Sequence, residues 1–447
     1  MNALVIFTIL SLLLVVGKML RMRLSFLQRL YLPSSVIGGL VGLVVLTSLG
    51  SRAPAEVADG MRAIPGFMIN VIFATLFLGA ATPRLKEVVR CAFPQLCLGQ
   101  IIAWGQYVVG LGLAGFVFVR WCGVPAAFGN LLEIGFEGGH GTVGGMAEAF
   151  KSFGWEDGVA LGYTVATVGM IIGIVLGMAL VQWAHRRGFV KEVRAFGDRS
   201  PHERLGIHPR RRRPSAGSQT VVCDSVDSLA WHVAIVGVSC LIGWGLRQLV
   251  PMKGFPLFPL CMIGGVLLQL VAKALKVDLL VDRVQMERIS GAALDFLVVS
   301  AVATIRLEVV VANWIPLVIL CVAGTAWTVA CVIFLAPRIF RDAWFERAIA
   351  EFGQTTGVTA TGLLLLRTVD PENRTPAAMS FGYKQLLHEP FMGGGLWTAL
   401  ALSLVYKFGW LPVFGFCAVM LFMWGICAFF SGKSGREEGE IGKWRQN

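Results

Sequence analysis

The sequence predicts an all-α polytopic membrane protein with two inverted-topology repeats. Each repeat has five transmembrane helices and one re-entrant hairpin, and one extra C-terminal helix follows. Three observations predict this fold: the composition, the recurrence of long apolar stretches, and motifs shared by the two halves. Of the 447 residues, 56% are hydrophobic and 15% are charged, and the mean hydropathy is +0.71. Soluble domains carry about 25% charged residues, so the composition excludes a soluble class.

Apolar stretches long enough to cross about 30 Å of hydrocarbon recur along the chain. Two other stretches, 124–150 and 345–366, are interrupted by glycine, threonine and charged residues. We interpret both as re-entrant hairpins, because irregular backbone at membrane depth is tolerated only where protein or a water-filled cavity satisfies it. The predicted spans are 3–20, 31–50, 65–82, 92–119, 158–184, 229–249, 255–275, 289–306, 311–335, 387–407 and 411–431.

Lysine and arginine predict the orientation of the chain. Lys18 and Arg21 follow the first apolar stretch, whereas a signal peptide carries its charges before that stretch, so we expect a retained helix with its N-terminus outside. The segments then assigned to the cytoplasm, 367–384 among them, hold 31 of the 39 Lys and Arg residues. The basic run "PRRRRP" at 209–214 is interpreted as a cytoplasmic loop that contacts anionic lipid rather than nucleic acid.

Three motifs recur in the same order in the two halves, which is typical of an internal repeat. Because each half has an odd number of spans, the second copy is inverted, as in many secondary transporters. The motif pairs are "LPSSVIGGL" (32–40) with "FPLCMIGGV" (258–266), "ATPRLKEVV" (81–89) with "ATIRLEVV" (303–310), and "GGHGTVGG" (138–145) with "GQTTGVTATG" (353–362). The predicted divisions are 1–184 for the first repeat, 185–228 for a basic linker, 229–407 for the second repeat, and 408–447 for the extra helix and cytoplasmic tail.

The two hairpins carry the predicted binding chemistry. Hairpin tips expose backbone N–H groups and helix N-termini, which attract anions. Unwound carbonyls and threonine hydroxyls at the same tips coordinate a hard cation such as sodium. The threonines are Thr142, Thr355, Thr356, Thr359 and Thr361. Glycines outside the hairpins are expected to allow tight helix packing instead; these are Gly38, Gly39, Gly264 and Gly265.

"GGHGT", "LPSSVIGGL" and "GVTATG" together resemble the bacterial sodium/glutamate symporters, over most of residues 1–407. The resemblance implies a homodimer in the bacterial cytoplasmic membrane. It also implies a scaffold part and a mobile part, which holds both hairpins and moves like an elevator with an acidic amino acid and sodium. It assigns to the binding site Gly138, Gly139, His140, Gly141, Thr142, Gly353, Gly357, Thr359 and Thr361; Gln354, Thr355 and Thr356 complete the predicted substrate site.

Ionisable residues inside a membrane are costly and usually functional. Glu137 stands where the family usually has a small hydroxyl residue. It could bind sodium, carry a proton, or accompany a neutral or cationic substrate, or it could merely bond a hairpin amide. Other ion-coupling candidates are Asp295, Thr142 and Thr359, and His140 is expected to form hydrogen bonds. Solvated or helix-capping roles are expected of Glu133, Glu148 and Glu351, near the hairpin bases.

The leading functional hypothesis is a sodium-coupled secondary transporter of glutamate or a related small carboxylate, with no cofactor besides the coupling ion and no nucleic-acid partner. A proton-coupled transporter, or a carrier of another organic or amino acid, is the alternative on the same fold. Two other classes are a membrane-embedded enzyme using His140 with Glu137, and a channel or non-transporting sensor. The chain shows no nucleophile motif or metal-ligand cluster, and inverted repeats favour alternating access.

Overall fold

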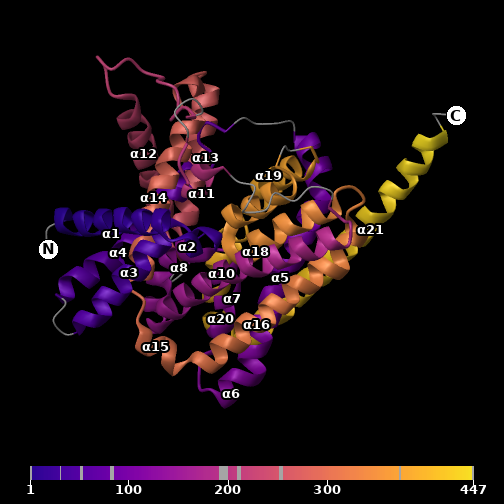
Figure 1. Ribbon diagram of the computed structural model, residues 1–447, viewed down its shortest axis with the longest axis horizontal. Helices are drawn as coiled ribbons and strands as arrows, with labels where there is room; N and C mark the ends of the chain where they lie inside the picture. Colours follow the sequence, from indigo (N-terminus) through magenta and orange to yellow (C-terminus); the bar gives the residue numbers. More distant parts are fainter. Residues whose placement is uncertain are drawn as a thin grey trace. The chain divides into compact units, whose positions relative to one another are not determined.

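The computed structural model (Figure 1) describes residues 3–30, 32–50, 54–80, 85–190, 200–208, 213–250, 255–371 and 374–444, and every regular element in these ranges is helical. The chain forms two compact units, each drawing on both halves of the sequence. Unit 1 comprises the described residues of Met1–Thr82, His140–Tyr163 and Arg199–Val309; unit 2 comprises those of Pro83–Gly139, Thr164–Asp198 and Val310–Asn447.

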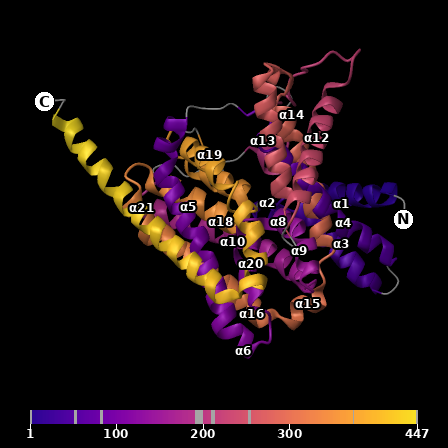
Figure 2. The ribbon, with the colours of Figure 1, turned by 180° about the vertical axis from the view of Figure 1, so that it is seen from behind.

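Unit 1 is built around the first three long helices of each half of the sequence. In Figures 1 and 2, α12 lies beside α13, and both pairs α3–α14 and α4–α14 are in contact. The helices are α1 (Ala3–Arg23), α2 (Ser25–Arg29), α3 (Ser34–Leu49), α4 (Ala55–Thr75), α8 (Gly139–Gly145, from His140), α9 (Ala147–Ser152), the start of α10 (Asp157–Arg186), α11 (Pro201–Leu205), α12 (Ser228–Leu249), α13 (Phe258–Ala274), a 3-10 turn Asp278–Leu280, and α14 (Arg283–Ala303).

Glycines bring the helices of unit 1 into backbone contact. A Cβ built on Gly38 of α3 would lie 2.3 Å from the carbonyl oxygen of Leu13 on α1. A Cβ built on Gly264 of α13 would lie 2.2 Å from the carbonyl oxygen of Ser239 on α12. No side chain fits at either position, so the prediction of tight helix packing is confirmed there.

The neighbouring glycines make the next helix contact in the same way. A Cβ on Gly39 would lie 2.6 Å from Cβ of Val302 on α14, and one on Gly265 would lie 2.4 Å from the carbonyl oxygen of Ala74 on α4. The packing prediction is therefore confirmed for this pair too. In the first half, Gly38 and Gly39 of α3 contact α1 and α14. In the second half, Gly264 and Gly265 of α13 contact α12 and α4, which are the corresponding helices.

Helix α4 begins and ends earlier than the predicted span 65–82, whose last two residues lie outside the described ranges. Its end is fixed by Arg283 of α14. The guanidinium Nη1 donates hydrogen bonds to the carbonyls of Thr75 (3.1 Å), Leu76 (2.8 Å) and Leu78 (3.3 Å). Carbonyls at a helix end have no partner within the helix, so a guanidinium from a distant helix satisfies them.

Unit 2 is organised around α5, along which α21 runs (Figures 1 and 2). Small residues allow this approach: a Cβ on Gly115 would lie 2.3 Å from the Trp410 ring. The elements are α5 (Leu85–Leu113), a π-helical segment Ala114–Phe118, α6 (Val119–Trp121), a 3-10 turn Ala126–Asn130, α7 (Leu131–Phe136), α10 from Thr164, α16 (Trp314–Ala330), a π-helical segment Cys331–Leu335, α17 (Ala336–Ile339), α18 (Trp344–Val369), α19 (Ala377–His388), α20 (Leu396–Phe408) and α21 (Trp410–Trp444). The unit boundary falls within α15 (Leu307–Ala312).

Seven helical stretches in the described ranges are long and apolar enough to cross a membrane, which fits an α-helical membrane protein. Three of the four other predicted spans correspond to the shorter helices α3, α13 and α20. The fourth corresponds to α14, which carries Arg283, Glu287, Arg288 and Asp295. The seven are Ala3–Arg23, Glu56–Thr75, Ala92–Trp121, Asp157–Arg186, Ser228–Leu249, Trp314–Ile339 and Trp410–Ser431.

The prediction of one continuous span over 387–407 is wrong. Helix α19 ends at His388, and α20 begins at Leu396. Between them, Pro390 has no backbone N–H to donate, and Gly393 and Gly394 have φ values of +65° and +111°. These residues favour a break, although hydropathy alone suggests a continuous helix.

Helix α18 occupies the predicted hairpin 345–366 and folds back on itself. Gly357 (φ −147°, ψ 34°) and Val358 (φ 64°, ψ 171°) leave the helical conformation. A Cβ built on Gly353 would lie 2.7 Å from Cα of Gly362, whereas residues nine apart in a straight helix are about 13 Å apart. The two arms of α18 therefore pack against each other.

The stretch predicted as the first hairpin, 124–150, is a row of short helices. The helix is interrupted at Glu137 and Gly138, between α7 and α8, and Gly139 has a φ of +68°. The boundary between the two units falls here, between Gly139 and His140.

Candidate functional site

A buried polar network fills the interior of unit 2, and Glu137 at the break after α7 is its meeting point. This side chain is 3% exposed. Its Oε1 accepts hydrogen bonds from Gln354 Nε2 (3.0 Å) and from His388 Nε2. Its Oε2 has no hydrogen-bond partner within the described chain. A Cβ on Gly139 would lie 2.5 Å from Val358 Cγ1, so the break after α7 and the turn of α18 meet here.

The tautomer of His388 follows from its neighbours. Trp104 Nε1, which can only donate, donates to Gln100 Oε1 at 2.8 Å. The amide nitrogen of Gln100 therefore faces His388 Nδ1, at 3.2 Å, and donates to it. Nδ1 is then the acceptor and Nε2 carries the hydrogen that it donates to Glu137. This chain of donors holds a neutral imidazole against the Glu137 carboxylate.

Glu133, one helical turn before Glu137, is fully buried, so the prediction of a solvated or capping role is wrong. Its Oε1 accepts from Gly393 N and from Thr398 Oγ1, both at 2.8 Å, and its Oε2 accepts from Tyr107 OH at 2.6 Å. Three donors compensate the cost of burying this carboxyl group. They come from α5, α20 and the break before α20, which only the tertiary fold brings to α7.

Lys384 of α19 and Glu351 of α18 form a fully buried ion pair, with 3.0 Å between Nζ and Oε2. The solvated or capping role predicted for Glu351 is therefore wrong, and so is the placement of Lys384 in a cytoplasmic loop. The ammonium also donates to Gln354 Oε1 (3.1 Å) and Gln385 Oε1 (2.9 Å). Gln95 Nε2 donates to Glu351 Oε1 at 2.9 Å. Gln354 thus connects Lys384 to the Glu137 cluster.

Thr359, just after the turn of α18, belongs to a second polar cluster. Its Oγ1 donates to Glu389 Oε1 (2.8 Å) and accepts from Gln385 Nε2 (2.5 Å). Gln385 Nε2 also lies 2.8 Å from Glu389 Oε1. Because Gln385 accepts from Lys384, this cluster is continuous with the network around Glu137.

The other threonines of α18 bond to their own helix. Thr355 Oγ1 donates to the carbonyl of Glu351 (2.7 Å), and Thr356 Oγ1 to that of Phe352 (2.6 Å). Thr361 Oγ1 donates to the carbonyl of Gly357 at 2.5 Å. The carbonyl of Thr355 accepts from Gln106 Nε2 at 2.7 Å, so this position contributes its backbone to the network.

Four predicted site residues, His140, Gly141, Thr142 and Asp295, lie in unit 1. The His140 ring is stacked on the Tyr163 ring, with 6.2 Å between centroids and 20° between planes. A Cβ on Gly141 would lie 2.8 Å from Ile69 Cδ1, and Thr142 is 1% exposed. Asp295 is exposed on α14, and Glu148 is exposed, as expected of a solvated residue.

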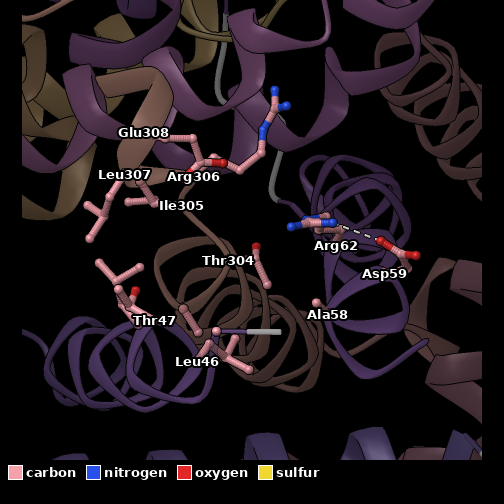
Figure 3. Close-up of a pocket in the computed structure, with 13 residues that line it drawn as sticks. Leu46, Thr47, Ala58, Asp59, Arg62, Thr304, Ile305, Arg306, Leu307 and Glu308 are labelled. Atoms are coloured by element: carbon pink, nitrogen blue, oxygen red, sulfur yellow. Dashed lines mark hydrogen bonds and ion pairs between the residues drawn. The ribbon is translucent and has the colours of Figure 1, made fainter. Parts of the chain in front are cut away.

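A cavity of about 520 Å³ in unit 1 is a second candidate (Figure 3). Arg62 is paired with Asp59 (2.8 Å), and Arg306 points away from Thr47 toward its partner Asp157 (2.7 Å). Both arginines are already neutralised by carboxylates, so the cavity offers an anion little net charge. The polar network of unit 2 is the better candidate site.

Sequence reasoning missed His388 and Lys384, although one signal could have found them. They are four residues apart, so a helix places them on one face. Lys384 lies just before the predicted span 387–407, and His388 lies at its start. Charged and polar residues at membrane depth usually have buried partners. Gln100, Tyr107 and Thr398 gave no such signal, because single polar residues are common in apolar helices.

Residues 1–369 match the model of the sodium/glutamate symporter family. The chain belongs to this family. A sodium/glutamate symporter of Escherichia coli (strain K12) is 22% identical over 414 residues, covering 90% of this chain and 96% of that protein. One of Haemophilus influenzae (strain ATCC 51907 / DSM 11121 / KW20 / Rd) is 23% identical over 265 residues, covering 58% of this chain and 61% of that protein.

Membership of a symporter family identifies a membrane transporter and not an enzyme. The imidazole that the structure places against Glu137 belongs to His388, a residue that the enzyme hypothesis did not name.

Proposed function

We propose that this protein couples the uptake of glutamate, or of a related small carboxylate, to sodium across the bacterial cytoplasmic membrane. The observation that carries the proposal is the buried polar network of unit 2, in a chain of the sodium/glutamate symporter family. A network of three buried carboxyl groups and one ammonium is costly within a membrane unless it binds ions or substrate.

Orphaned polar atoms support this location of the site. The buried side-chain N and O atoms found without a hydrogen-bond partner all belong to residues of unit 2. Two of these atoms lie near the turn of α18. One is Glu137 Oε2; the other is Oε1 of Gln106, whose Nε2 donates to the carbonyl of Thr355. Such groups in a native structure are uncommon, and a bound ion or ligand would satisfy them. We assign Glu137 to the coupling ion and the peptide groups around Gly139 and Val358 to the substrate carboxylate.

The proposed architecture is two inverted repeats with divisions at 184/185, 228/229 and 407/408, each with one re-entrant hairpin. The matching contacts of Gly38 and Gly264 support it. So do the π-helical segments that begin at Ala114 and Cys331, each near the end of the fourth long helix of its half.

The proposed transport mechanism is an elevator in which unit 2 moves as the mobile part and unit 1 serves as the scaffold of a homodimer. The N-terminus would lie outside and the C-terminus in the cytoplasm. The network ties α18, α19 and α20 to α5 and α7, all in unit 2, so these helices would move together.

Purified protein in liposomes tests the proposal. An inward sodium gradient should drive saturable glutamate uptake, and glutamate should raise the thermal unfolding midpoint only when sodium is present. Glu137→Gln should lose at least about tenfold in sodium affinity, because the neutral amide cannot replace the carboxylate. Exposed Glu148→Gln is the matched control. Absence of gradient-dependent uptake of any amino or organic acid would rule out the transporter assignment.

A proton is the second candidate for the coupling ion, and the unpartnered buried Oε2 of Glu137 favours it. A carboxyl group with one unpartnered buried oxygen can hold a proton instead of a cation. In that case glutamate would stabilise the protein in a way that follows pH rather than sodium, and Glu137→Gln would remove the pH dependence.

A further inference from the structure

The buried ammonium of Lys384 has the surroundings of a small bound cation. Nζ lies 3.0 Å from Glu351 Oε2, 3.1 Å from Gln354 Oε1 and 2.9 Å from Gln385 Oε1. One carboxylate and two amide carbonyls are the oxygen ligands that hard cations take in proteins. The two amide oxygens accept hydrogen bonds from the ammonium, and the carboxylate pairs with its charge.

The neighbouring helix α5 is shaped around this group. A Cβ built on Gly99 would lie 2.4 Å from Lys384 Cε, 2.8 Å from Nζ and 2.8 Å from Glu351 Oε2. Only glycine leaves room there for both members of the ion pair. The Phe381 ring centroid is 6.0 Å from Nζ, which adds a weaker cation–π attraction.

The charge of Lys384 acts on the candidate site through one side chain. Gln354 accepts from the ammonium through Oε1 and donates to Glu137 through Nε2. Its amide dipole is therefore oriented by Lys384, with its positive end toward the Glu137 carboxylate. Deletion of the ammonium would leave both Glu137 and Glu351 without this compensation.

We propose that Lys384 is a tethered cation, occupying with its ammonium a three-oxygen site that would otherwise need a sodium ion. The inference rests on the proposed sodium coupling. Lys384 then sets the number of sodium ions that the network requires, because one positive charge is built into the chain. The site around Glu351, Gln354 and Gln385 takes no free ion in the natural protein.

The test is a cation-dependent rescue, measured as the thermal unfolding midpoint of the full chain without substrate. In choline chloride, Lys384→Ala should lower the midpoint by about 5 °C or more, because the partner carboxylate is left buried and unpaired. Sodium chloride at the same ionic strength should restore more than half of this loss, since alanine leaves space for the ion. Lys407→Ala, at the exposed end of α20, is the matched control and should show no sodium-specific gain.

Two further variants separate a cation site from a merely structural ion pair. Lys384→Met fills the space with an apolar chain, so sodium should not rescue it. Lys384→Ala combined with Glu351→Gln removes both charges, so it should be more stable in choline than Lys384→Ala and should show no sodium rescue. Equal midpoints of Lys384→Ala in choline and sodium would overturn the proposal, as would a double variant no more stable than the single one.

The natural chain distinguishes failure of this proposal from failure of the proposed function. If it shows no sodium-dependent stabilisation by glutamate, the proposed coupling fails. If it shows that stabilisation and Lys384→Ala shows no sodium-specific rescue, only the tethered cation fails. If the natural chain shows the stabilisation and Lys384→Ala shows the rescue, glutamate uptake by Lys384→Ala should depend more steeply on sodium. Its Hill coefficient for sodium should be about one higher than that of the natural chain.

Discussion

Thr398 donates a hydrogen bond from Oγ1 to Glu133 Oε1 over 2.8 Å, and this bond ties α20 to α7. Thr398→Val keeps the shape and removes the donor, so it should cost about 1–3 kcal/mol of stability. The measurement is the unfolding midpoint in detergent. Thr325→Val is the control, because its hydroxyl bonds to the carbonyl of Cys321 in its own helix (2.7 Å). Equal losses in the two variants would contradict the assigned role.

The neutral Nε2–H tautomer of His388 is a second prediction. Nitrogen-15 NMR of protein labelled in histidine should show a protonated Nε2 and an unprotonated Nδ1 for this ring. Gln100→Leu removes the donor to Nδ1 and the acceptor of Trp104, so it should lower stability by about 1–3 kcal/mol and allow the other tautomer. A protonated Nδ1 in the natural protein would show that the chain of donors is assigned wrongly.

Valine substitutions of the α18 threonines should affect glutamate binding to different extents, depending on the partner of each hydroxyl group. Thr359→Val breaks contacts with Glu389 and Gln385, and should weaken sodium-dependent stabilisation by glutamate about tenfold or more. Thr356→Val loses only a bond to its own helix, so its glutamate response should stay within about twofold. Titration of the unfolding midpoint with glutamate measures both. A larger loss in Thr356→Val than in Thr359→Val would reverse the assignment.

The close contact of the two arms of α18 gives a fourth prediction. Gly353→Leu would force the arms apart, because even a Cβ there would lie 2.7 Å from Gly362 Cα. We expect a loss of at least about 3 kcal/mol and no glutamate binding. Gly382→Leu is the control and should fold normally, because a Cβ at this exposed position of α19 would meet no atom within 4 Å outside the neighbouring backbone of its own helix. Normal folding of Gly353→Leu would show that α18 does not fold back as described.

Local sequence patterns predicted much of the fold. Glycine next to small or apolar residues indicated the close helix contacts of Gly38 and Gly264, because only a residue without a side chain fits against a backbone carbonyl. The break in the helix at Glu137 and the turn at Gly357 also fall within the stretches where glycine and threonine interrupt the apolar pattern. Hydropathy alone missed the break between α19 and α20, since a few polar and glycine residues barely change a mean over a long window.

The candidate site was predicted only in part, because its members are far apart in sequence. Glu137 and Gln354 were identified from the hairpin motifs, and they form a hydrogen bond. His388 and Lys384 were not, since nothing in their own segment shows that a carboxylate from a distant helix will pair with them. Thr355 and Thr356 have the residue type expected of ligands, yet helix geometry directs their hydroxyls to carbonyls four residues earlier.

The sequence by itself determined that this chain is a helical membrane protein, which family it belongs to, and where its helices are interrupted at Glu137 and Gly357. These properties depend on composition, short motifs and local backbone preferences. Tertiary structure alone decided which carboxyl groups are buried and what compensates them. Glu133 could have been solvated, but packing closes α5 and α20 over it; Lys384 could have lain in a loop, but the cost of an unpaired buried charge fixes it beside Glu351.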